Sequence, residues 1–174
     1  STKRKPGDPR LVEESRALCG MTHPDPRCMD ACVAYNVLLA ELTHRAGDVE
    51  RAFDVALASV QDGDPEVVEI VGRVLAMPQT SLEKAPRVYA DQPIGYVLVA
   101  FELALVAVKQ AASYEEGLVT VVNLGGDADT NGAIAGALLR ARHGLHKIPK
   151  RWRLAILRQA EVDEAYGWIE ACAV

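Results

Sequence analysis

The stretch Asn123-Leu-Gly-Gly-Asp-Ala-Asp-Thr-Asn131 is the most informative part of this 174-residue chain. It places two carboxylates and a hydroxyl within four residues, directly after a pair of glycines. On a regular helix Asp127 and Thr130 share one face, whereas Asp127 and Asp129 point in nearly opposite directions. The two carboxylates therefore converge only if the segment begins in a turn, which the glycine pair allows.

Carboxylate and hydroxyl oxygens are hard ligands that suit Mg²⁺, Mn²⁺ or Ca²⁺. Three of them cannot complete an octahedron, so water, substrate or another protein segment must supply the rest. Alternatively, Asp127 or Asp129 only caps the helix that follows. A cap needs one aspartate, however, and a second carboxylate two residues later adds repulsion unless a cation or donor lies between them. The pattern therefore favours a metal site, with Thr130 as the third ligand.

The residues after this motif predict a central helix from Asp127 to about His143, ended by Gly144. Small residues fill positions 132–137 apart from one isoleucine, which lets a neighbouring backbone approach closely. The most apolar segment, 94–108, is too short to span a membrane and carries Glu102 in its middle. We therefore expect it to be a buried helix in the core.

Other segments predict further helices, and none has an alternating partner with which a strand could pair. Asp8, Asp48, Asp64 and Ser113 are expected to cap helix starts. Residues 77–93 contain three prolines and predict an irregular segment. The further helices are expected at 10–19, 28–43, 49–60, 64–76, 113–123, 150–158 and 161–173. The sequence thus predicts a compact all-α bundle, a single domain over residues 1–174 with a flexible segment at 1–8.

The composition argues against several classes of protein. A net charge of -5 gives no field that would attract a polyanion, so nonspecific nucleic-acid binding is not expected. Residues 1–10 are polar, without the apolar stretch of a signal peptide, and no membrane segment is expected. The four cysteines lack the spacing of a disulfide framework, which favours a reducing cytoplasm. Cys28, Cys32 and His23 leave a zinc site open, but a fourth ligand is missing and buried thiols explain the pattern more simply.

The chain also resembles the ADP-ribosylglycohydrolases, a family that includes the bacterial enzyme that reactivates dinitrogenase reductase and the ADP-ribosyl-acceptor hydrolases. The matching residues occur in the family's order between about Arg10 and Trp152. They are Thr22-His23-Pro24, Gly-Gly-Asp-Ala-Asp-Thr at 125–130, Gly-Ala-Ile-Ala-Gly-Ala at 132–137, His143-Gly144, Ile148-Pro149 and Trp152.

This resemblance implies an all-α ADP-ribosylglycohydrolase-like fold around a dinuclear Mg²⁺ or Mn²⁺ centre. The implied activity is hydrolysis that releases ADP-ribose from an ADP-ribosylated protein or from a small molecule containing ADP-ribose. The metal ligands would be Asp127, Asp129 and Thr130. Gly125 and Gly126 would bring their backbone near the ribose or diphosphate.

His23 falls where the family lines the ADP-ribose cleft. A histidine in a loop that caps the next helix is an equally open interpretation of this residue.

The chain departs from the family pattern in one important respect. Members look about twice as long, and their N-terminal half carries a Gly-Asp-Ala segment, a Thr-Asp-Asp-Thr metal motif and an Asn-Gly-Ser-like phosphate loop, none of which occurs here. We interpret the chain as the C-terminal, metal-binding half of a Mg²⁺-dependent hydrolase, with the N-terminal half absent or present as a separate or cleaved chain. Activity of this chain alone, and its general base, stay open. A noncatalytic ADP-ribose-binding or structural member is the main alternative, and an unrelated helical scaffold is the other.

Overall fold

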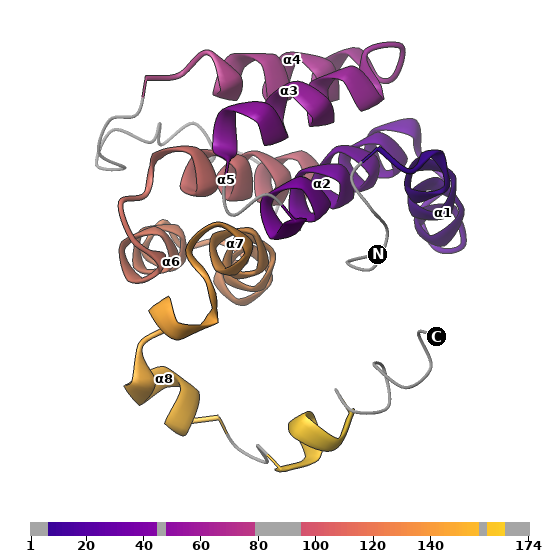
Figure 1. The fold of residues 1–174 in the computed structure, drawn as a ribbon. Helices are drawn as coiled ribbons and strands as arrows, with labels where there is room; N and C mark the ends of the chain where they lie inside the picture. The colour runs from indigo at the N-terminus through magenta and orange to yellow at the C-terminus, as the bar shows by residue number, and fades with distance from the viewer. Residues whose placement is uncertain (1–6, 45–47, 79–94, 157–159, 166–174) are drawn as a thin grey trace.

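The computed structural model describes residues 7–44, 48–78, 95–156 and 160–165, and all regular structure within these ranges is helical. The predicted all-α fold is confirmed (Figure 1). The helices are α1 (Pro9–Gly20), α2 (Pro26–His44), α3 (Val49–Val60), α4 (Pro65–Leu75), α5 (Val97–Gln110), α6 (Tyr114–Asn123), α7 (Ala128–His143), the 3-10 turn η2 (Leu145–Lys147) and α8 (Lys150–Leu154). Residues 160–165 are helical as well.

Helices α2 and α5 form the middle of the bundle. The pair α3 and α4 packs on one side of them, and α6 and α7 pack on the other (Figure 1). The apolar segment is the buried core helix that its composition predicts, because α5 is buried from Ala100 to Lys109. It begins at Val97, since Gly95 takes a left-handed conformation with φ +81.

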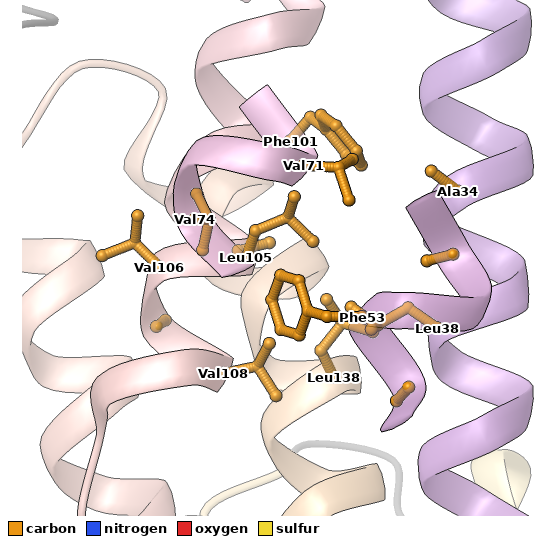
Figure 2. Packing of buried hydrophobic residues seen from close by; sticks show 14 of the residues in the cluster. Ala34, Leu38, Phe53, Val71, Val74, Phe101, Leu105, Val106, Val108 and Leu138 are labelled. Atoms are coloured by element: carbon orange, nitrogen blue, oxygen red, sulfur yellow. The ribbon is translucent and has the colours of Figure 1, made fainter. Parts of the chain in front are cut away.

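The core lies where these layers meet. Phe53 of α3, Leu105 of α5 and Leu138 of α7 come from three different helices, and Figure 2 shows their side chains close together. Each is at most 1% exposed. The burial of such apolar side chains is the main force that holds the helices together.

Two charged side chains of α5 are also buried, and each pairs with a neighbouring helix. Glu102 accepts a hydrogen bond from Arg73 of α4. The Lys109 ammonium lies 2.5 Å from Glu50 of α3 and faces the ring of Phe53. Within the described residues, the helices lack the combination of length and apolarity that crossing a bilayer requires.

Four predicted helix caps are present. Asp8, Asp48, Asp64 and Ser113 each accept a hydrogen bond from a backbone N–H in the first turn of the helix that follows. These bonds satisfy amides that have no partner within their own helix.

The boundaries of α2 and α8 also differ from the predicted ones. Helix α2 begins at Pro26 instead of Cys28, because Asp25 caps it. Helix α8 ends at Leu154 instead of Arg158. Trp152 packs against the core, but residues 153–156 are exposed and add no buried face that would stabilise a longer helix.

Some predictions fall on residues outside the described ranges. These are most of the irregular segment 77–93, residues 1–6 of the N-terminal segment and residues 166–173 of the last helix.

Candidate functional site

A left-handed turn leads into α7, as the glycine pair predicts. Gly125 and Gly126 have φ values of +79 and +67. A Cβ atom at either position would meet no heavy atom within 4 Å. The backbone conformation, and not lack of space, therefore accounts for glycine at both positions.

The turn brings the two carboxylates together. Asp127 and Asp129 share a side-chain hydrogen bond, which lowers the pKa of Asp129, and the backbone N–H groups of Thr130 and Asp129 lower it further. Asp127 is the N-cap residue of α7, yet its side chain makes no capping hydrogen bond. This differs from the four capped helices above and argues against helix capping as the role of the Asp127 carboxylate.

Close packing against α6 fixes the position of α7. A Cβ on Gly132 would lie 3.1 Å from Cγ2 of Val122, and one on Gly136 would lie 3.3 Å from the hydroxyl of Tyr114. The predicted close approach at this small-residue run is confirmed. Arg140, three residues beyond this run, is exposed.

A pocket of about 620 Å³ opens beside the start of α7. Its walls come from the loop between α1 and α2, from the first turns of α2 and α5, and from α7. Thr130 and His23, 107 positions apart in the sequence, both line it. Much of the remaining wall is apolar or aromatic, including Tyr35, Tyr96, Val97, Phe101 and Ile134.

The Asp127 carboxylate lies at the edge of this pocket. A Cβ on Gly95, which lines the pocket, would lie 3.7 Å from Oδ2 of Asp127. Gly125 and Gly126 are not among the residues that line the pocket. In the structure their demonstrated role is to form the turn that precedes Asp127.

His23 does not cap α2. Its ring Nδ1 lies 2.9 Å from Oγ1 of Thr22, and its side chain is exposed. The cap is Asp25, whose carboxylate accepts the backbone N–H of Arg27 at 2.9 Å. The interpretation of His23 as a helix cap is therefore wrong, and its predicted role in substrate binding is untested.

One charged group in the pocket was missed by the sequence analysis. Arg27 donates through Nε and Nη2 to Asp25, at 3.1 Å each, and its Nη1 lies 3.4 Å from the hydroxyl of Tyr96. The hydrogen bond from Arg27 lowers the pKa of Asp25. A usable signal was present: Asp25-Pro26 repeats the Asp-Pro pattern that begins α1 and α4.

Tyr35 joins two walls of the pocket. Its hydroxyl donates to the backbone carbonyl of Ile134 in α7 at 2.9 Å, and burial raises its pKa to about 12. This bond links α2 to the first half of α7, one turn beyond Thr130.

In the ranges that the structure describes, no three His, Cys, Asp or Glu side chains are placed to hold a metal ion together. The zinc arrangement of Cys28, Cys32 and His23 is therefore not formed. Among the residues that the structure describes, no third carboxylate or imidazole joins Asp127 and Asp129.

The chain is similar to known proteins in both sequence and structure. A sequence model described as ADP-ribosylglycohydrolase matches residues 3–173. The chain belongs to the ADP-ribosylglycohydrolase family. It is 26% identical over 154 residues to "ADP-ribosylarginine hydrolase Tri1" of Serratia proteamaculans (strain 568), covering 88% of this chain and 39% of that protein.

A second relative of this ADP-ribosylglycohydrolase chain is the "ADP-ribosyl-[dinitrogen reductase] glycohydrolase" of Rhodospirillum rubrum. The two are 36% identical over 64 residues, which is 37% of this chain and 22% of that protein. A solved structure titled "ADP-ribosylglycohydrolase-related protein complex" matches with a TM-score of 0.70 and 30% identity, over 90% of this chain and 51% of that one. The chain thus spans about half or less of the length of these relatives.

Proposed function

We propose that this chain forms the metal-binding part of a Mg²⁺-dependent hydrolase that releases ADP-ribose from an ADP-ribosylated acceptor. One observation carries the proposal. The turn at 125–126 sets the Asp127 and Asp129 carboxylates side by side, at the edge of a pocket that Thr130 and His23 line.

The residues present fit a hard divalent cation in part. Asp127 is not used as a cap, and its side chain lies beside that of Asp129, whose pKa it lowers. Two carboxylates and the Thr130 hydroxyl suit Mg²⁺ or Mn²⁺ and leave positions for water and substrate. A bound cation would act as a Lewis acid and lower the pKa of a bound water.

The pocket fits the substrate class. Its volume of about 620 Å³ lies in the range of small-molecule sites. Tyr35, Tyr96 and Phe101 offer surfaces against which a planar ring can pack. His23 and Arg27 supply N–H donors for phosphate oxygens, and Arg27 is already oriented by Asp25.

Hydrolysis at the anomeric carbon needs an activated water on one face of the ribose and an acid or Lewis acid at the bond that breaks. In this proposal Asp127, Asp129 and Thr130 hold and orient the metal centre and do not transfer protons themselves. His23 and the pocket wall hold the ADP-ribose so that its ribose faces Thr130.

Water, substrate or another polypeptide segment would supply the remaining ligands. Leu124 directly precedes the glycine turn and is 40% exposed. Val122, two residues earlier, is 42% exposed, and Val119 lies one turn before it on α6. Such exposed apolar side chains suit a contact with a further part of the hydrolase. The acceptor that we propose to test first is ADP-ribosylarginine, the substrate class in the name of the Serratia relative.

A noncatalytic role remains the second candidate, because the described residues bring together only two carboxylates and no third ligand of that kind. Such a protein would bind ADP-ribose in the same pocket without cleaving the acceptor bond.

One experiment separates the two roles. An ADP-ribosylarginine peptide is incubated with the protein and Mg²⁺, released ADP-ribose is measured, and binding of ADP-ribose is followed by calorimetry. Asp129→Asn tests the metal site, and Glu69→Gln makes the same change of charge on the exposed side of α4 as the matched control.

The hydrolase proposal predicts Mg²⁺-dependent release that Asp129→Asn abolishes and Glu69→Gln keeps. Binding of ADP-ribose without release would support the noncatalytic role. Absence of both release and binding would contradict both.

A further inference from the structure

Two cysteine thiols from different helices meet on the wall of the pocket. Cys19 lies at the end of α1 and Cys32 in the second turn of α2. Both line the pocket, together with Cys28, and all three are free and partly buried. The proposed hydrolysis uses none of them.

A chain of hydrogen bonds connects these thiols to the loop that carries His23. Burial and, secondly, the hydrogen bond between its thiol and the Cys19 sulfur together raise the pKa of Cys32 to about 12. Cys19 in turn donates to the backbone carbonyl of His23 at 3.7 Å. The helices are close at this point, because a Cβ on Gly20 would lie 3.5 Å from the sulfur of Met29.

We propose that Cys19 and Cys32 are an oxidation site: a peroxide joins them in a reversible disulfide across the pocket wall, which releases the His23 carbonyl from its thiol donor. The inference does not depend on the hydrolase activity, because it concerns only the thiols and the loop.

The reaction balances with hydrogen peroxide as the oxidant. The Cys19 sulfur attacks one peroxide oxygen, the O–O bond breaks, and the other oxygen leaves as water, which gives a sulfenic acid. The Cys32 sulfur then attacks the Cys19 sulfur, the S–S bond forms, the S–O bond breaks, and a second water leaves. In total the two thiols lose two electrons and two protons, which reduce the hydrogen peroxide to two molecules of water.

The order of these steps follows from the environment of each thiol. Cys32 is held protonated by burial and by its hydrogen bond, so it suits the second step better than the first.

Cys28 is a poor partner for Cys32. The two residues lie one turn apart on α2, where Cβ atoms are about 5–6 Å apart. A disulfide needs Cβ atoms about 3.5–4.5 Å apart. The bond therefore joins Cys19 of α1 to a thiol of α2. The hydrogen bond between Cys32 and Cys19 selects Cys32 for this role, and Cys28 serves as the matched control.

The test is peptide mapping of the protein after treatment with hydrogen peroxide, in a Cys172→Ser background so that only the pocket thiols remain. We expect a mass loss of about 2 Da for two hydrogens, a cross-linked peptide joining Cys19 to Cys32, and reversal by dithiothreitol. The cross-link should persist in Cys28→Ser and disappear in Cys32→Ser. Amide exchange at residues 20–25 should become faster in the oxidised protein.

The proposal is overturned if peroxide yields only single-thiol oxidation, or if the cross-link involves Cys28. A Cys19–Cys32 bond that leaves the exchange at residues 20–25 unchanged would overturn the release of the His23 loop.

Discussion

Replacement of Gly126 by alanine tests the turn on which the candidate metal site depends. Gly126 has φ +67, and a Cβ there would meet nothing within 4 Å. The substitution therefore introduces no clash, and its effect comes from the backbone alone. A left-handed conformation costs a residue with a Cβ about 1–2 kcal/mol, so Gly126→Ala should destabilise the fold by about that amount.

Gly72, in the middle of α4, provides the matched control. A Cβ there also meets nothing within 4 Å, but its backbone is helical. Alanine should stabilise this position by about 0.5–1 kcal/mol. The two variants should therefore differ by roughly 2 kcal/mol, or about 4–8 °C in melting temperature for a domain of this size.

The assay is thermal and urea unfolding followed by circular dichroism at 222 nm. Gly126→Asn should recover part of the loss, because asparagine tolerates the left-handed region. If Gly126→Ala is as stable as Gly72→Ala, the backbone at residue 126 is not left-handed. The convergence of Asp127 and Asp129 would then lack its structural cause.

Three further predictions concern the buried polar groups. Gly63→Ala should lower the free energy of unfolding in urea by about 2 kcal/mol or more. The new Cβ would lie 2.6 Å from the buried Oδ2 of Asp30, which accepts a backbone N–H at 2.8 Å. An unchanged free energy of unfolding would mean that the Asp30 side chain lies elsewhere. Glu50→Ala should destabilise the protein by about 3 kcal/mol, because it leaves the buried Lys109 ammonium without its partner. Lys109→Met should be close to neutral, because it removes the buried charge and leaves Glu50 exposed to solvent. Equal losses of unfolding free energy in urea would contradict this. Burial lowers the pKa of His143, so the folded state binds fewer protons than the unfolded state. The melting temperature should therefore fall as the pH drops below about 6.5. If His143→Gln shows the same dependence of melting temperature on pH as the wild type, His143 is not the cause.

The sequence predicts the fold well where local chemistry determines it. Asp8, Asp48, Asp64 and Ser113 mark helix starts because their side chains satisfy amides in the next turn. The same Asp-Pro pattern occurs at Asp25-Pro26, where a helix start was not predicted. The small-residue run correctly predicts the close approach of α6 and α7.

The pocket could be predicted only in part. Thr130 and His23 were both singled out, but their meeting depends on how α1, α2, α5 and α7 pack. Tyr96 and Arg27 come together across 69 positions, and periodicity does not reveal contacts between segments so far apart. The early end of α8 likewise reflects the exposure of residues 153–156, which helix propensity does not reveal.

The most direct test of the central claim is to count the Mn²⁺ ions bound to the protein by electron paramagnetic resonance, which detects the free ion. The account predicts that the wild-type protein and Glu69→Gln bind Mn²⁺, that Mg²⁺ displaces it, and that Asp127→Asn and Asp129→Asn lose the binding. If the wild type binds no Mn²⁺, or if the aspartate variants bind it equally well, then Asp127 and Asp129 do not hold a divalent cation.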